Sequence, residues 1–249
     1  MRKFILAAIA GAAFAGSAFA HVPDYVSAAI ADKARPAADV ARDADRKPAD
    51  MVMFAGIKPG SIVVELIPGK GYFTRIFAKA VGPKGHVYSF VPTEFDAVFK
   101  KNNVPIPTGT DPNYPNVTYI HASIAKLPIP QLADVVWTSQ NYHDLHDKFS
   151  GPVDIATFNK AVLAALKPGG TFIVLDHSAA DGSGLRDTDT LHRIDSAAVK
   201  SEVTAAGFKY VGKSDVLRNP ADPRDKLVFD PSIRGKTDQF IFKFRKPKK

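Results

Sequence analysis

Apolar positions along this chain alternate between continuous runs and helical spacing. Residues 62–67 are apolar except for Glu65. This run is too continuous for a strand with one solvent-exposed face, and it suits the centre of a parallel sheet covered on both faces. Helical spacing resumes at 72–81, directly after Pro68, Gly69 and Gly71. The pattern therefore predicts a buried strand, a tight turn and a helix, an arrangement that suits a nucleotide-like ligand.

The same alternation continues through the rest of the chain. Apolar runs predict strands at 86–91, 116–121, 133–139, 171–175, 208–217 and 239–244, and helical spacing predicts helices at 94–101, 154–166 and 189–206. We therefore expect an α/β fold, a doubly wound and mostly parallel sheet of seven strands that ends in an antiparallel hairpin. Residues 102–115, with four prolines, are predicted to be a loop or flap. This segment and the charged segment 218–236 are both predicted to cover the site.

Residues 23–53 alternate alanine with charged side chains, which predicts two or three short helices broken at Pro36 and Pro48. Helices of this kind usually pack across the edge or mouth of an α/β domain. Some of their charged side chains could reach a ligand there, although surface pairs at helical spacing are the simpler interpretation: Arg42, Asp45, Arg46 and Asp50.

The first 20 residues have the pattern of a cleaved secretory signal. Arg2 and Lys3 precede an apolar run at 4–15, and Ala-Phe-Ala at 18–20 is a typical cleavage site. We expect a mature chain that begins at His21, is periplasmic or secreted, and has no stable membrane insertion. The predicted organisation is a signal peptide at 1–20, a helical extension at 21–53 and one α/β domain at 54–249.

Composition narrows the remaining function classes. The 249 residues include no cysteine, which excludes thiolate zinc sites and requires the core alone to hold an exported protein together. The net charge is 33 − 25 = +8. Much of the excess positive charge lies in the C-terminal tail, at Lys243, Arg245, Lys246, Lys248 and Lys249. No aromatic side chains alternate with these cations as in a nucleic-acid-binding surface, so we expect a solvated tail and no nucleic-acid binding.

Three motifs occur in a recognisable order. E-L-I-P-G-K-G occupies 65–71, L-K-P-G-G occupies 166–170 and A-A-G-F occupies 205–208. Over residues 52–244 the chain resembles class I S-adenosylmethionine-dependent methyltransferases, and more narrowly the exported predicted methyltransferases of proteobacteria. The resemblance implies a Rossmann-like fold, S-adenosylmethionine as cofactor and a small-molecule acceptor whose identity the sequence does not give.

The resemblance also implies a set of cofactor-binding residues: Glu65, Pro68, Gly69, Gly71, Tyr72, Val91, Ser123 and Asn141. Three positions depart from the family pattern. Ile67 stands in the first glycine place of the motif. Val91 stands where the family has an acid for the ribose hydroxyls, with Glu94 three residues later, and Ser123 replaces the adenine-side acid.

Methyl transfer needs alignment of the reactants and sometimes a base, but no metal. Candidate groups follow the strands at 133–139 and 171–175, where parallel strands end and function is usual. A histidine beside an aspartate can act as a base near neutral pH. The predicted catalytic residues are Tyr142, His143, Asp144 and His177.

Two alternatives remain open at the level of sequence. His143, Asp144, His146 and His177 could converge on a divalent metal, although their spacing matches no strong motif. A degenerate methyltransferase fold could instead bind a small molecule without catalysis. The leading hypothesis is a methyltransferase with an unknown acceptor and no metal.

Overall fold

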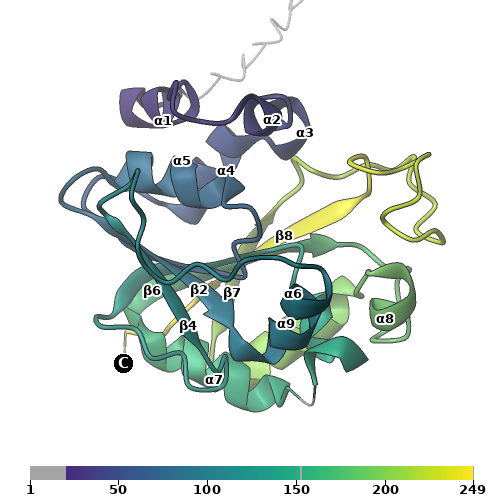
Figure 1. The fold of residues 1–249 in the computed structure, drawn as a ribbon. Coiled ribbons are helices and arrows are strands. Elements are labelled where there is room, and N and C mark those ends of the chain that lie inside the picture. The colour runs from purple at the N-terminus through teal and green to yellow at the C-terminus, as the bar shows by residue number, and fades with distance from the viewer. Residues whose placement is uncertain (1–20, 152, 249) are drawn as a thin grey trace, which may run out of the picture.

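The structure is a computed structural model that describes residues 21–151 and 153–248. The predicted signal peptide, residues 1–20, lies outside the described residues. Strands and helices alternate along the chain, as predicted (Figure 1). The strands are β1 (Ile62–Leu66), β2 (His86–Pro92), β3 (Gly109–Thr110), β4 (Val117–Ala122), β5 (Ala133–Ser139), β6 (Leu166–His177), β7 (Lys209–Ser214) and β8 (Gln239–Arg245).

The helices lie between these strands and before the first of them. They are α1 (Asp24–Ile30), α2 (Ala37–Val40), α3 (Asp43–Arg46), α4 (Pro48–Ala55), α5 (Tyr72–Val81), α6 (Asp96–Lys101), α7 (Ile155–Ala165), α8 (Thr188–Leu191) and α9 (Ser196–Ala205). Three short 3-10 helices add to them: η1 (Thr93–Phe95), η2 (His143–His146) and η3 (Lys148–Ser150).

The described strands form one sheet in the order β3-β4-β2-β1-β5-β6-β8-β7. The five central strands are parallel, and β8 pairs antiparallel with both β6 and β7, which confirms the doubly wound sheet and its terminal antiparallel strands. The two-residue strand β3 pairs antiparallel with β4 inside the segment predicted to be a loop, so the described sheet has eight strands instead of the seven predicted. Residues 102–115 therefore extend one sheet edge, because Gly109 and Thr110 pair with Tyr119 and Thr118 of β4.

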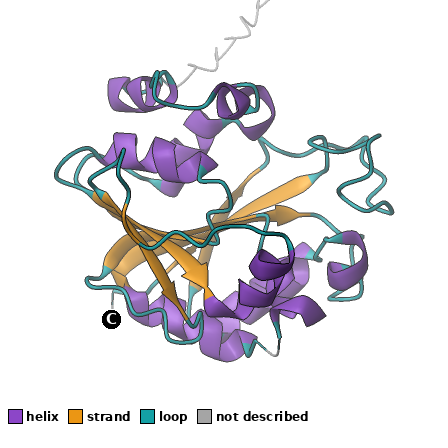
Figure 2. Ribbon diagram, in the orientation of Figure 1, coloured by secondary structure: helices purple, strands orange, loops and turns teal. Residues whose placement is uncertain are grey.

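Helices cover both faces of the sheet, so the fold has three layers (Figure 2). On one face α1, α4 and α5 pack against strand residues that include Val63 and Trp137. On the other face α7 and α9 pack against residues that include Val64 and Phe172. Side chains alternate between the two faces along each strand, and both sets are apolar, as expected for a parallel sheet buried on both sides.

The N-terminal helices belong to the first of these cores. Val26 of α1 and Met51 of α4 are fully buried in the cluster that contains Phe77 of α5. Pro36 precedes α2 and Pro48 is the first residue of α4, so both prolines mark helix starts, as predicted. No helix in the described part of the chain is both long and apolar enough to span a membrane.

The predicted helix at 189–206 is wrong, because two helices occupy this segment. α8 ends at His192, whose φ of 52° is left-handed, and α9 begins after Asp195. The Asp195 carboxylate accepts a hydrogen bond of 2.9 Å from the backbone N–H of Ala197, a typical N-cap. The cap and the left-handed residue direct the intervening chain across the end of β6.

Candidate active site

The turn after β1 has the backbone of a glycine-rich loop. Ile67, Gly69 and Gly71 have φ values of 53°, 56° and 75°, all left-handed. Ile67 adopts this conformation although it is β-branched, and its N–H is held by the carbonyl oxygen of Phe90 at 2.9 Å. The turn thus brings unhindered backbone to the N-terminus of α5, where a polar ligand can approach closely.

A cavity of about 330 Å³ opens beside this turn, at the carboxyl ends of β1, β5 and β6. Its walls come from the N-terminal helices, the glycine turn, the ends of the strands and the two segments after β6 and β7. The lining residues are Arg42, Arg46, Glu65, Leu66, Ile67, Pro68, Gly69, Lys70, Tyr72, Phe73, Trp137, Ser139, Gln140, Asn141, His143, Asp144, His177, His192, Val228 and Phe229.

Most residues predicted to bind a cofactor lie in this wall. Glu65, Pro68, Gly69, Tyr72 and Asn141 line the cavity, whereas Gly71 belongs to the turn behind it.

Val91 and Ser123 are placed elsewhere, because neither is part of the lining. Val91 is buried in β2, and the hydroxyl of Ser123 donates to Glu94 Oε1 at 2.7 Å. The backbone N–H of Ile124 also donates to Glu94, at 3.1 Å.

Of the two segments predicted to cover the site, only one reaches the cavity. Val228 and Phe229 of 218–236 line it, but the described residues 102–115 contribute none of the lining.

Glu65 is buried between β1, β2 and α5. The hydroxyls of Thr74 and Ser89 both donate to Glu65 Oε2. Burial raises the pKa of Glu65 to about 7, although these two hydrogen bonds oppose the shift. Glu65 therefore carries a carboxyl group that changes charge near neutral pH.

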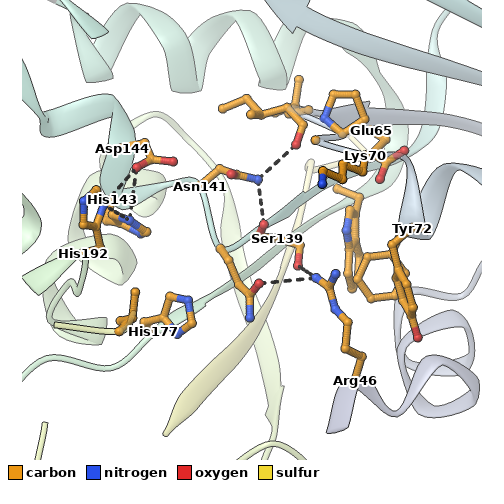
Figure 3. A pocket seen from close by; sticks show the side chains of 18 of the residues that line it. Arg46, Glu65, Lys70, Tyr72, Ser139, Asn141, His143, Asp144, His177 and His192 are labelled. Carbon is orange, nitrogen blue, oxygen red and sulfur yellow. Dashed lines mark hydrogen bonds and ion pairs between the residues drawn. The ribbon is translucent and has the colours of Figure 1, made fainter. Parts of the chain in front are cut away.

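Arg46 lines the cavity, so it is one of the helix side chains predicted to be able to reach a ligand, although a surface pair was the simpler prediction. Its guanidinium lies 4.5 Å from the ring centroid of Tyr72 and 4.7 Å from that of Phe73, and it donates to Ser139 Oγ at 3.0 Å (Figure 3). Burial lowers the pKa of Arg46 to about 10, so it is still charged at pH 7. The pattern Arg42-x-x-x-Arg46, two cations one helical turn apart, was the available signal.

Tyr72 fastens the N-terminal helices to the turn. Its hydroxyl donates to Asp43 Oδ1 at 2.6 Å, and Arg35 donates to both oxygens of the same carboxylate at 2.9 and 2.6 Å. Arg35 is 5 % exposed. This ion pair keeps α3, and with it Arg46, over the cavity.

His143 lies at the opposite end of the cavity from Tyr72 (Figure 3). Its Nδ1 is 2.8 Å from Asp176 Oδ1, and its backbone N–H donates to Asp176 Oδ2 at 2.9 Å. Burial alone would lower the pKa of His143, but the carboxylates of Asp176 and Asp144 outweigh it and hold the pKa well above its ordinary value. The side chain of His143, in the 3-10 helix η2 that follows β5, is thus fixed by Asp176 of the neighbouring strand β6.

His177 also lines the cavity, but its environment differs. Its Nδ1 is 2.7 Å from the hydroxyl of Thr237. Burial lowers the pKa of His177 to about 3, so the imidazole is neutral at pH 7. The pKa values of His177 and His143, which line one cavity, are therefore shifted in opposite directions.

Tyr142 was predicted to be catalytic, and the structure places it on the other side of its backbone. It is fully buried, with its hydroxyl 3.0 Å from Glu202 Oε2 and 2.9 Å from Asn159 Nδ2. His146 Nε2 lies 3.3 Å from the same Glu202 oxygen. Both side chains face α7 and α9, so Tyr142 does not reach the cavity and His146 does not join His143 and His177.

Comparison with known proteins points to one class of enzyme. No family model matches the chain. Its sequence is 31% identical over 130 residues to the ubiquinone/menaquinone biosynthesis C-methyltransferase UbiE of Vibrio vulnificus, covering 50% of this chain and 44% of that protein. The counterpart from Ectopseudomonas mendocina is 29% identical over 134 residues, 51% of this chain and 46% of that protein. The chain thus spans about half the length of the curated relatives it matches.

Solved structures give the fold. An Aquifex aeolicus SAM-dependent methyltransferase superposes with a TM-score of 0.52 at 18% identity, over 81% of this chain and 89% of its own. A Burkholderia thailandensis 1,6-didemethyltoxoflavin-N1-methyltransferase, solved with bound 1,6-didemethyltoxoflavin and S-adenosylhomocysteine, superposes with a TM-score of 0.51 at 17% identity, over 82% of this chain and 79% of its own. The chain has the Rossmann-like fold of the S-adenosylmethionine-dependent methyltransferases.

Proposed function

We propose that the protein is an S-adenosylmethionine-dependent methyltransferase that acts on a small-molecule acceptor. The observation that carries this proposal is the left-handed turn of residues 67–71, which leads from β1 into α5 beside a cavity at the carboxyl ends of the parallel strands. The fold alone would not decide the activity. The names of the sequence relatives, which are C-methyltransferases, support transfer of a methyl group.

The charges of the cavity suit the amino-acid part of the cofactor. Arg46, Arg42 and Lys70 line the wall around the turn, where the cofactor carboxylate would be neutralised. Arg46 is the best placed of the three, because two aromatic rings and Ser139 hold its guanidinium. We assign the cofactor carboxylate to Arg46.

The opposite end of the cavity is left for the acceptor. His143, Asp144 and His192 meet there, and Phe229 lies beside the ring of His192, with 5.2 Å between ring centroids. Phe229 is 53% exposed on a segment between β7 and β8 and can close over a bound molecule. The acceptor would then lie between polar strand ends and an aromatic cover, away from bulk water.

Calorimetry with S-adenosylmethionine and S-adenosylhomocysteine tests this assignment. We expect the wild type to bind both, and Arg46→Ala to bind about tenfold to a hundredfold more weakly, the usual range for losing a hydrogen-bonded charged partner. Arg245→Ala is the matched control, because Arg245 is exposed at the end of β8 and lines no part of the cavity.

Binding and catalysis need separate evidence. Wild-type protein that binds neither ligand at about 1 mM, a weak affinity for a cofactor site, would refute the proposed function. Binding without transfer of labelled methyl groups to any component of a small-molecule extract would instead favour the non-catalytic alternative.

A further inference from the structure

Four side chains at the acceptor end of the cavity direct their donor atoms at one point. They come from the segment after β5 and from the end of α8, and their nitrogen and carboxylate oxygen atoms lie within 4.8 Å of one another: His143, Asp144, Asp147 and His192. Three of them are drawn in Figure 3, where Asp144 and both rings meet at the far end of the cavity from Tyr72.

The separations match those around a small cation. His143 Nε2 is 3.2 Å from both His192 Nδ1 and Asp144 Oδ1, and His192 Nδ1 is 3.5 Å from Asp144 Oδ1 and 3.7 Å from Asp147 Oδ2. Ligand bonds of 2.0–2.2 Å in a tetrahedron would place the donor atoms about 3.4 Å apart. Four of the six separations are thus close to those of a tetrahedral site, and all six are within 4.8 Å.

Asp147 provides an independent reason to expect a cation. Its side chain is 1% exposed, and neither carboxylate oxygen has a hydrogen-bond partner among the described residues. The nearby hydroxyl of Thr188 donates instead to the carbonyl oxygen of Leu185, at 3.3 Å. A buried carboxylate without a partner is costly, whereas a bound metal would satisfy it.

The orientation of His143 is that of a metal ligand. Its Nδ1 is held by Asp176, itself fully buried, so Nε2 is the atom presented to Asp144 and His192. A carboxylate behind the imidazole is the usual partner of a metal-bound histidine, because it fixes the ring and its tautomer.

We propose that His143, Asp144, Asp147 and His192 bind a divalent transition metal. Two imidazole nitrogens and two carboxylate oxygens suit Mn²⁺, Fe²⁺, Co²⁺, Ni²⁺ or Zn²⁺ rather than Mg²⁺ or Ca²⁺. The ligand set differs from the one suggested by sequence, because His146 and His177 are replaced by Asp147 and His192. The ion would hold an oxygen or nitrogen of the acceptor in the cavity; this last step rests on the proposed methyl transfer, whereas metal binding does not.

Elemental analysis and calorimetry test the site directly. Protein purified without chelator is expected to contain close to one equivalent of a divalent transition metal, and EDTA-treated protein is expected to rebind Mn²⁺, Co²⁺ or Zn²⁺. Asp147→Asn and His192→Ala should weaken binding by at least about tenfold, since even outer partners of metal ligands contribute that much. His146→Ala is the matched control, a histidine of the same segment that should leave the affinity unchanged.

Thermal unfolding of Asp147→Asn separates a metal ligand from a structural residue. Without metal the variant should be at least as stable as the wild type, because it removes an unpaired buried charge; with metal, only the wild type should gain in melting temperature. A wild type that binds none of these ions at 1 mM, or loses its ion in His146→Ala but not in His192→Ala, overturns the proposal. Metal binding without S-adenosylmethionine binding would uphold the site and refute the proposed function.

Discussion

Ile67 occupies a backbone conformation that glycine normally takes. A left-handed φ costs a residue with a side chain about 1–2 kcal/mol, and Ile67 tolerates it because its side chain is buried, 8% exposed, in the core below the sheet. Burial of an isoleucine contributes about 1.5–3 kcal/mol.

Replacing Ile67 with glycine therefore removes both a strain and a larger stabilising contact. We expect Ile67→Gly to lower the free energy of unfolding by about 1 kcal/mol and to raise the affinity for S-adenosylmethionine, because the turn becomes less bulky. Urea unfolding and calorimetry measure the two effects. A variant more stable than the wild type would show that strain outweighs burial at this position.

Glu65 makes the stability of the fold depend on pH, and its raised pKa gives the direction of that dependence. Its pKa is about 7 in the fold and 4.5 without it, so between these values the folded chain holds a proton that the unfolded chain releases. Stability from this group is therefore lost as the pH rises from 4.5 to 7, by an amount on the order of 3 kcal/mol at most.

Glu65→Gln keeps the shape of the side chain and removes its titration. The variant should match the wild type in melting temperature near pH 4.5 and exceed it at pH 8. The difference between the two proteins isolates Glu65 from other titrating groups. Parallel pH profiles for the two proteins would mean that Glu65 has the same pKa in the folded and the unfolded chain.

At the scale of elements, a buried ion pair ties the segment before α9 to the cover of the cavity. Arg193 is fully buried and donates to Asp222 at 2.8 and 3.1 Å, and also to the carbonyl oxygens of Ser178 and Lys226. Asp222 belongs to the segment 218–236 that carries Phe229. The side chain of Arg193 thus positions both the neighbouring His192 and the segment that carries Phe229.

Breaking this pair should be strongly destabilising. Arg193→Met leaves the Asp222 carboxylate buried without its cation, which typically costs about 3–5 kcal/mol. Lys213→Met is the matched control, since Lys213 and Asp215 pair at the surface with both side chains more than half exposed, and such pairs contribute about 1 kcal/mol or less. Equal urea midpoints for the two variants would contradict the role of Arg193.

Most elements could be predicted from the sequence, because apolar runs and glycine turns reflect local physics. The face on which each side chain of a short turn lies could not be predicted in the same way. Tyr142 and His146 are four residues apart and share the face toward Glu202, whereas His143 and Asp147, also four apart, share the face toward His192. Treating the run 140–146 as one cluster merged the two faces, and applying the spacing of four would have found Asp147.

The break at His192 was also out of reach of periodicity. It depends on Asp195 and on the partner of Arg193, which lies 29 residues further along the chain. A surface pair was the simpler prediction for Arg46 for a similar reason, because its contact with Ser139 spans 93 residues. Local patterns position the strands of this molecule, and distant pairs position its site.

At the scale of the whole molecule, the cavity is built from the full length of the fold. Its wall runs from Arg42 to Phe229, and the first helices meet the end of β5 across the mouth. A polypeptide that has folded only in part has some of these surfaces but no enclosure. The chain must therefore fold to completion before it can take up a ligand, and the ligand acts on stability only by trapping the finished state.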